Sequence, residues 1–396
     1  GETDMKRRQL LSAGLASLAT PASAIPDLQG CEPCVAVHPP TPRSPHRKLR
    51  VQPVMTNMVH SGVWEGPCRF NVVAVAQEAE NVKNSYARWA RSVKDGKFSF
   101  GEAVEGLEPR LVLFNEAFTL PPAELLPLDQ LKDRIDALFI SPDGASFAAA
   151  EIARRYHKPV VLLGLNCRTV DIAAYAKTIG EEVFVAADNP ELERLFALLR
   201  ARAVYRETRV LFPTDRGFPS VASLTGVTDL PDLEKRHGIQ VRMISFKLLS
   251  DEMERTLADR GRLAQAERGA DELIRGAQHS WVDRQYVVRS LQFRQAVEAL
   301  MAVHACNAFT IECFEFCSSR LPEKWKITPC LVHTLFKDAG YASSCEGDLG
   351  ALLATRLLLS VSGKSSHMGN MFTGKENTVV INHSVPGIRM NGFDQP

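Results

Sequence analysis

The fold class is indicated most clearly by residues 136–186, which read DALFISPDGASFAAAEIARRYHKPVVLLGLNCRTVDIAAYAKTIGEEVFVA. Three short apolar runs in this segment are rich in β-branched residues and predict buried strands: DALFIS, PVVLLG and EEVFVA. Amphipathic segments at 145–156 and 169–177 separate these runs and predict helices. Continuously apolar strands that alternate with helices are typical of a parallel sheet covered on both faces.

The same alternation extends in both directions and predicts two α/β halves. We expect an α/β protein with two Rossmann-like, doubly wound parallel-sheet domains at 69–206 and 207–363, followed by a short β-rich segment at 364–396. An incomplete small domain is one interpretation of that last segment. The further predicted strands are FNVVAVA near Phe70, RLVLFN near Arg110, RVLFPT from Arg209, QVRMISF from Gln240, AFTIECF at Ala308–Phe314, YASSC from Tyr341 and TVVIN from Thr378.

Helices are predicted in the second half around 230–237, within 250–304, at 328–340 and at 348–360. One apolar stripe in the second of these regions recurs with helical spacing, which indicates a buried face: Phe293, Val297, Leu300 and Met301. The helix at 348–360 is apolar nearly all round, so we expect it to be central.

The first 24 residues predict an export signal. From Met5 the chain reads MKRRQLLSAGLASLATPASA, with a basic start, an apolar middle and a small-residue cleavage site. The adjacent Arg7 and Arg8 resemble a twin-arginine signal, so we expect a periplasmic protein. An amphipathic helix is the alternative, and the protein would then be cytoplasmic. Residues 25–68 are rich in proline and predict a linker or arm, in which Cys31 and Cys34 favour an incidental pair or a local disulfide.

Composition excludes several classes of function. The chain has 47 basic and 46 acidic side chains, and a formal net charge of +1 argues against a nucleic-acid binder with a basic face. The sequence contains no uninterrupted apolar run of about 18 residues, so we predict no membrane-spanning helix. No G-x-G-x-x-G follows the first predicted strand and no phosphate-binding G-x-x-x-x-G-K-[ST] occurs, so we expect no nucleotide cofactor.

Four polar residues follow the predicted strands of the second half. Glu312 lies toward the end of AFTIECF, Glu346 and Asp348 lie in CEGD before a helix, and His383 follows TVVIN. Open parallel sheets bind ligands beyond the carboxyl ends of their strands, so these residues are candidates for a site. Each has a structural alternative: Asp348 as a helix cap, His383 as a hydrogen-bonded loop residue, and Glu312 as the partner of an arginine.

The C-terminal third resembles the L-fucose/L-arabinose isomerase-like proteins, and in particular the fucose-isomerase branch. The matching segments are TIECF at 310–314, Pro329-Cys330, SCEGDLGALLATRLLLSVSGK at 344–364, MGN at 368–370 and INHSVP at 381–386. The resemblance implies a metal-dependent isomerase that interconverts an aldose and a ketose through a cis-enediolate. It also implies a small sugar substrate and a homo-oligomer, either a trimer or a hexamer.

The resemblance further implies a site for Mn²⁺ or another divalent cation. Its ligands would be Glu312, Asp348 and His383, and the two acids would also transfer the proton. Oxygen-rich ligand sets of this kind suit Mn²⁺, and the cation would polarise the sugar carbonyl. Residues that would contact the substrate or support the ligands are Glu346, Arg216, Phe218 and Asn370.

Two other functions remain open, and so do other choices of metal ligand. The chain could be an exported, two-lobed sugar-binding protein, or a catalytically inactive relative of the isomerases. Nine cysteines are too few for a disulfide scaffold. Those of the C-terminal third are expected to be small buried apolar residues, with Cys345 the one that borders the site. Alternative metal ligands are His304, His333 and His367.

Overall fold

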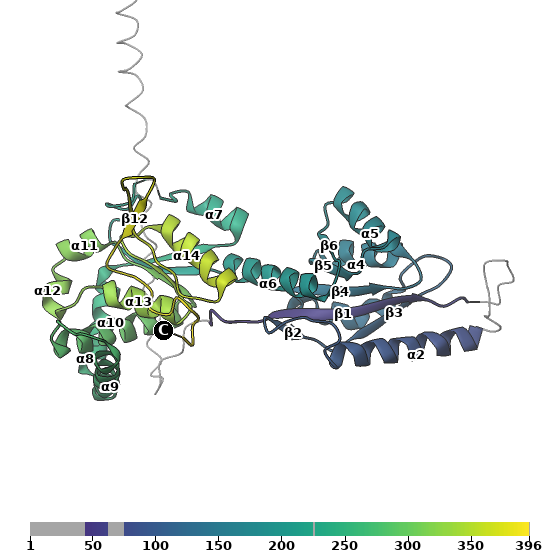
Figure 1. Cartoon of the computed structure of the whole chain (residues 1–396), viewed down its shortest axis with the longest axis horizontal. Helices are drawn as coiled ribbons and strands as arrows, with labels where there is room; N and C mark the ends of the chain where they lie inside the picture. Colours follow the sequence, from purple (N-terminus) through teal and green to yellow (C-terminus); the bar gives the residue numbers. More distant parts are fainter. Residues whose placement is uncertain (1–43, 62–74, 225, 396) are drawn as a thin grey trace, which may run out of the picture. The chain divides into compact units, whose positions relative to one another are not determined.

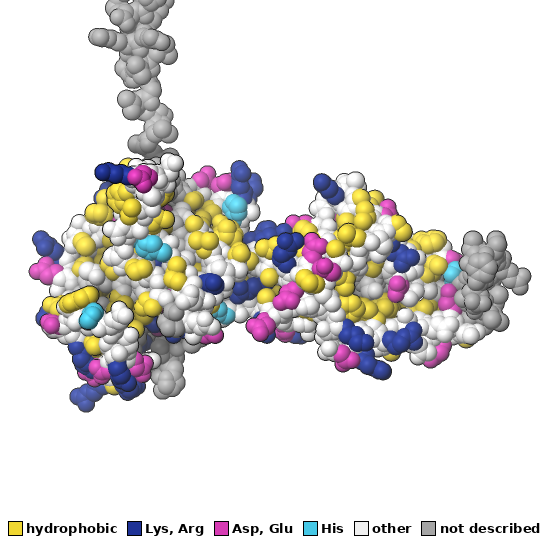
Figure 2. Space-filling view, viewed as in Figure 1, with side chains coloured by type: hydrophobic (Ala, Val, Ile, Leu, Met, Phe, Trp, Pro, Cys, Tyr) yellow, Lys and Arg dark blue, Asp and Glu magenta, His cyan; other side chains and the backbone are white. Residues whose placement is uncertain are grey.

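The computed structural model describes residues 44–61, 75–224 and 226–395. Within them lie two parallel sheets, each flanked by helices, and a small antiparallel hairpin near the C-terminus (Figure 1). The predicted α/β class with two Rossmann-like sheets is therefore confirmed. The predicted export signal and the Cys31–Cys34 pair lie outside the described residues. Basic and acidic side chains are interspersed over the face shown in Figure 2.

The first sheet has six strands in the order β2-β1-β4-β5-β6, with β3 also paired to β1, and all its pairs are parallel. Its strands are β1 (Leu49–Met58), β2 (Val104–Gly106), β3 (Arg110–Phe114), β4 (Ala137–Pro142), β5 (Val160–Leu163) and β6 (Val183–Ala186). The connecting helices are α2 (Val75–Lys94), α3 (Pro122–Asp129), η1 (Lys132–Arg134), α4 (Ser146–Tyr156), α5 (Cys167–Thr178) and α6 (Asn189–Arg206).

Both faces of this sheet are buried, as expected for a doubly wound domain. Leu138 and Ile140 pack in one core with residues of α3, α4 and α5, whereas Phe139 between them packs in another core with residues of α6. Successive residues of a strand point to opposite faces, so an uninterrupted apolar strand such as β4 is needed to fill both cores.

The first strand was predicted in the wrong place. Residues 49–58, assigned to the proline-rich arm, form the long strand β1, whereas Val75 and Ala76 of the expected strand near Phe70 begin helix α2. Proline usually excludes a central strand because it cannot donate to the ladder. Here the neighbouring Gln52 is buried and its amide donates to the carbonyls of Pro53 and Glu108, both at 2.8 Å.

The second sheet has four parallel strands in the order β10-β9-β7-β8. They are β7 (Arg209–Pro213), β8 (Gln240–Ile244), β9 (Ala308–Thr310) and β10 (Ala342–Ser344). The helices are α7 (Leu230–His237), α8 (Phe246–Ala258), α9 (Arg260–Gly276), α10 (Arg284–Val303), α11 (Cys313–Ser318), α12 (Leu321–Trp325), α13 (Cys330–Asp338) and α14 (Leu349–Ser362). The predicted stripe of α10 is confirmed, because Phe293, Val297, Leu300 and Met301 are all buried.

Two predictions for this half need correction. The strand expected over Ala308–Phe314 ends at Thr310, and Cys313 already begins α11. The apolar helix α14 is not central, because Leu357 and Leu358 are 49% and 55% exposed although Leu352 on its other face is fully buried. Helix α14 therefore packs against the sheet with one face and exposes the other, although most of its residues are apolar.

The C-terminal segment contains an exposed antiparallel hairpin of β11 (Asn370–Thr373) and β12 (Val379–Asn382). Every residue of both strands is exposed, including Met371, Phe372 and Ile381. No helix among the described residues combines the length and the apolar character that crossing a membrane requires.

Candidate functional site

The predicted site residues gather at the carboxyl edge of the second sheet. The chain passes from β7 to β8 on one side and later to β9 on the other, so the strand order reverses between β7 and β9. The region beyond the carboxyl ends of the strands, at such a reversal, is the usual place for a ligand in sheets of this kind. The loop after β7 and the residues after β9 and β10 meet there.

Glu312 follows β9 and begins α11. Its carboxylate accepts hydrogen bonds from the backbone N–H groups of Phe314 and Glu315, so it caps this short helix. The residue is only 1% exposed. Burial raises the pKa of the Glu312 carboxyl, and the nearby carboxylates of Glu315 and Glu346 raise it further, against the opposing effect of the two backbone bonds. A carboxyl group in this environment is suited to accept and return a proton.

The loop after β7 is fixed by Glu315. One oxygen of its carboxylate accepts from the backbone N–H groups of Asp215 and Arg216, both at 2.9 Å, and the other accepts from the Thr214 hydroxyl at 2.7 Å. The backbone of Arg216 is thus held beside the carboxylates of α11. The ring of Phe218 instead packs against the ring of Phe212, with centroids 5.3 Å apart, and belongs to the core.

Glu346 and His383 form a pair at this edge of the sheet. Nε2 of His383 lies 3.3 Å from Oε1 of Glu346, and their side chains are 9% and 23% exposed respectively. Nδ1 of His383 accepts the backbone N–H of Ser384 at 2.9 Å, so in the neutral ring Nε2 carries the proton and donates it to Glu346. His383 therefore orients the Glu346 carboxylate.

The backbone at Glu346 is left-handed, with φ of +65°, which is unfavourable for any residue other than glycine. Gly347 follows with φ of +64°, and a Cβ there would meet Cζ of Phe212 at 2.9 Å. The turn is held by Ser220, whose hydroxyl donates to the Glu346 carbonyl, and by a 3.0 Å bond from Gly347 N–H to Ile311 O. This strained turn fixes the direction of the Glu346 side chain.

The segment that carries His383 is anchored to α13. Lys337, which is fully buried, donates through Nζ to the carbonyl of Val385, and Thr334 donates to the carbonyl of Pro386 at 2.8 Å. One oxygen of Asp338 accepts from the backbone N–H groups of Ile388 and Arg389. Burial lowers the pKa of Lys337 to about 8. Three side chains on one face of α13 thereby position the imidazole.

Asp348 performs the capping role that was its structural alternative. One carboxylate oxygen accepts the backbone N–H of Ala351 at 2.9 Å and caps α14, with Asp348 at the N-cap position. Glu346, two residues earlier, is the acid that faces His383. Asn370 is exposed at the start of β11 and pairs with Asn382.

The cap is testable by two substitutions at one position. Asn is as good an N-cap as Asp, so Asp348→Asn should leave the free energy of unfolding nearly unchanged, whereas Asp348→Ala should lower it by about 1 kcal/mol. Urea denaturation of the two variants and the parent measures the difference. Equal losses in both variants would mean that the negative charge, and not the cap, is what stabilises the chain.

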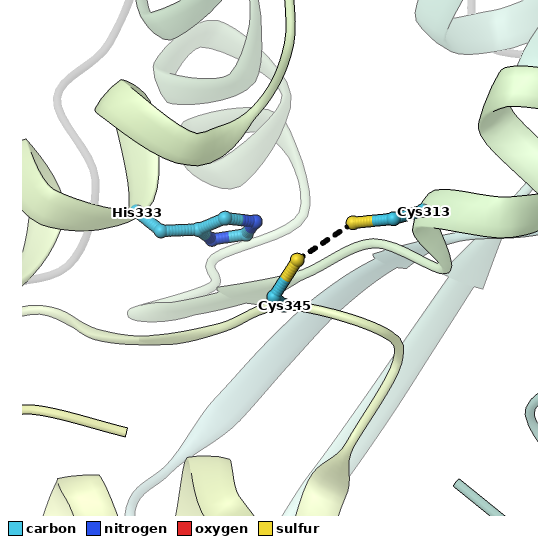
Figure 3. A group of neighbouring side chains, drawn as sticks. All are labelled: Cys313, His333 and Cys345. Carbon is cyan, nitrogen blue, oxygen red and sulfur yellow. Dashed lines mark hydrogen bonds between the residues drawn. The ribbon is translucent and has the colours of Figure 1, made fainter. Parts of the chain in front are cut away.

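A second group of side chains lies directly behind the acids. Cys313 follows Glu312, Cys345 precedes Glu346, and His333 comes from α13 (Figure 3). Among the residues that the structure describes, this is the group of three potential metal ligands whose ligand atoms all lie within 4.8 Å of one another. The two sulfur atoms are 2.8 Å apart. Their contact and their burial raise the pKa of the Cys313 thiol.

Sequence reasoning found only part of this arrangement. The structure brings Glu312, Glu346 and His383 to one edge of the second sheet, while Asp348 and Phe218 have structural roles. Cys345 was expected to border the site, and His333 was one of three alternative ligands, but no sequence spacing joins them to Cys313 because the three come from separate elements. The one feature of the sequence that could have pointed to this group is that Cys313 and Cys345 are each adjacent to a candidate acid, Glu312 and Glu346 respectively.

The described geometry places Glu312, Glu346 and His383 at the strand-order reversal of a doubly wound sheet, next to a cysteine–histidine group. Comparisons of the chain with protein-family models and with curated proteins return no match.

Proposed function

We propose that the chain is a metal-dependent isomerase that interconverts an aldose and a ketose. The observation that carries this proposal is the meeting of Glu312, Glu346 and His383 at the strand-order reversal, where small ligands bind in this fold. Among the described residues, neither Glu312 nor Glu346 forms an ion pair with a lysine or arginine, although Glu312 is almost fully buried. The resemblance of residues 308–386 to the fucose-isomerase branch supports the same function.

The donor set fits a divalent cation of the Mn²⁺ type, with a change in the ligands expected from the sequence. Glu312 is a buried carboxyl group without a lysine or arginine partner among the described residues, and such a group is costly to ionise unless a cation neutralises it. We propose that Glu312 and Glu346 would hold the cation, since Glu346 faces His383 and its charge raises the pKa of Glu312, which places the two acids close together. Asp348 caps α14, and His383 directs its N–H to Glu346. Glu312 also caps a helix, and it would bind the cation through the lone pairs that its two backbone bonds leave free. When bound, the cation would polarise the carbonyl group of an open-chain sugar.

The protein's own groups account for the proton transfer. Glu312 has a raised pKa, so its carboxylate would take the proton from C2 of the sugar and return it to C1. The backbone of Arg216, held by Glu315, lies at the same edge of the sheet and would contact a sugar hydroxyl.

The test is exchange of the C2 proton of aldoses in deuterated water, followed by NMR over a panel of pentoses, hexoses and 6-deoxyhexoses with added Mn²⁺. Glu312→Gln should lower the exchange rate at least about 100-fold, because it removes the general base. Asp348→Asn is the matched control and should retain the activity. Full loss in Asp348→Asn together with normal activity in Glu346→Gln would instead restore the ligand set expected from the sequence.

The competing function is a sugar-binding protein without turnover. Sugar binding that is unaffected by chelators, in a chain that exchanges no C2 proton, would favour it and contradict the isomerase. A small-sugar substrate, export and assembly as a trimer or hexamer remain parts of the proposal. The exposed apolar hairpin β11–β12 supports the assembly, since contiguous apolar surface of this kind is typical of interaction sites.

A further inference from the structure

The outward nitrogen of His333 is a buried polar atom without a partner. The residue is fully buried, and among the described residues nothing donates to or accepts from its Nε2. Its ring stacks on Phe309, with centroids 5.4 Å apart, and its outer edge faces the two sulfur atoms (Figure 3). Buried polar groups are nearly always paired, so this nitrogen indicates a missing ligand.

The hydrogen-bond network accommodates the ring with its proton on Nδ1. In this neutral tautomer Nδ1 of His333 donates to the Ser343 hydroxyl, 2.7 Å away, and that hydroxyl donates to the carbonyl of Phe309 at 3.1 Å. Nε2 then has a free lone pair. A histidine that binds a metal through one nitrogen typically donates its other N–H to an oxygen in this way.

The two cysteines complete a soft ligand set with this lone pair. Cys345 is buried and Cys313 is partly buried, and both are free thiols. The thioether of Met368 accepts the backbone N–H of Cys345 at 3.2 Å and lies in the same apolar cluster. Two thiolates and an imidazole are the ligands that Zn²⁺ and similar thiophilic cations prefer.

We infer that Cys313, Cys345 and Nε2 of His333 form a binding site for one thiophilic cation of the Zn²⁺ type. On binding, both thiols release their protons to solvent, while the imidazole binds without losing one. Zn–S bonds of about 2.3 Å at tetrahedral angles hold two sulfur atoms about 3.8 Å apart, so the side chains separate by about 1 Å from their present contact. Three protein ligands leave a fourth position for water.

The site has a consequence for the acids in front of it. Cys313 and Cys345 belong to the loops after β9 and β10, so a shared cation ties these two loops together. Glu312 and Glu346 are the adjacent residues on the same loops. The cation thus acts as a structural clamp, and this inference does not depend on the isomerase proposal.

A disulfide between Cys313 and Cys345 is the competing interpretation. It would use both sulfur atoms but leave the buried Nε2 of His333 without a partner, whereas a cation satisfies all three groups at once. The orphaned nitrogen therefore favours the cation.

The experiment titrates the full chain, reduced and freed of metal with a chelator, first with Co²⁺ and then with Zn²⁺. We expect a sulfur-to-cobalt charge-transfer band in the near ultraviolet that saturates at one Co²⁺ per chain and disappears when Zn²⁺ is added. Cys345→Ala should lower the Zn²⁺ affinity at least about 100-fold in a chelator competition. Cys306→Ala, which removes another buried free thiol, is the matched control and should bind Zn²⁺ normally.

Three results would overturn the inference. The first is a reduced, folded chain that gives no thiolate band with Co²⁺. The second is a Zn²⁺ affinity that falls equally in Cys306→Ala and Cys345→Ala. A Cys313–Cys345 disulfide found by mass spectrometry in the protein as purified, together with no Zn²⁺ binding after reduction, would replace the cation with a redox pair. Glu312→Gln and Glu346→Gln should bind Zn²⁺ normally, which separates this site from the proposed Mn²⁺ site.

Discussion

Val54→Asp should unfold the first domain. Val54 is completely buried. It lies in β1, which pairs with β3 on one side and with β4 on the other. An aspartate there would place an unpaired charge in the core, which costs several kcal/mol, on the order of the whole stability of a domain. Val54→Ala removes only two methyl groups and should cost about 2 kcal/mol.

Far-UV circular dichroism and urea denaturation of the purified chain measure these losses. Lys48→Asp introduces the same side chain at an exposed position just before β1 and should be tolerated within about 0.5 kcal/mol. If residues 49–58 belonged to an arm, Val54→Asp and Lys48→Asp would behave alike. A Val54→Asp chain with the urea midpoint of the parent would show that β1 is not part of the sheet.

The strands that were predicted correctly share one property. Those such as β4 and β5 are uninterrupted apolar runs, because both faces of the sheet are covered. Strand β1 differs: Gln52, Pro53 and Thr56 interrupt its apolar pattern, and all three are buried. Only the tertiary structure provides the carbonyl of Glu108 that accepts from Gln52, so local sequence could not identify this strand.

The candidate site was predictable as far as strand ends could be located. Glu312 and Glu346 follow strands whose carboxyl ends lie side by side, and that rule places them together without coordinates. The replacement of Asp348 by Glu346 in the proposed ligand set could not be foreseen from sequence, because the proposal depends on the left-handed backbone of Glu346 and on the N-cap of α14. The cysteine–histidine group depends on α13 crossing behind the sheet, which sequence spacing does not record.

Asp136 should prove to be the main electrostatic anchor of β1. Its carboxylate, at the start of β4, accepts from Nη1 of Arg47 at 2.8 Å and from the backbone and side chain of Arg50 at 2.8 and 3.2 Å. The side chains of Asp136 and Arg47 are only 14% and 22% exposed. Removing one partner of such a pair leaves the other charge poorly solvated, so Asp136→Ala should cost about 3 kcal/mol.

The loss of unfolding free energy in Asp136→Ala should depend on pH, which distinguishes an ionic contribution from packing. Burial raises the pKa of Asp136, but the bonds from Arg47 and Arg50 outweigh burial and hold the pKa below its usual value. Because the folded pKa is depressed, the stabilisation is complete above the unfolded value of about 3.9 and is lost as pH falls through the folded pKa. The difference in unfolding free energy between the parent and Asp136→Ala should therefore be constant from pH 7 down to about pH 4 and shrink below it.

Urea denaturation of both proteins across this pH range tests the prediction, with two further variants as controls. Asp136→Asn keeps an acceptor for the Arg50 N–H but loses the charge, so it should lie between the parent and Asp136→Ala. Asp133→Ala removes an exposed acid from the neighbouring turn and should change stability by less than about 0.5 kcal/mol. The ionic interpretation would be wrong if the difference in unfolding free energy between the parent and Asp136→Ala were the same at acid pH. It would also be wrong if Asp136→Asn were as unstable as Asp136→Ala. Either result would mean that packing around Asp136, and not its charge, stabilises β1.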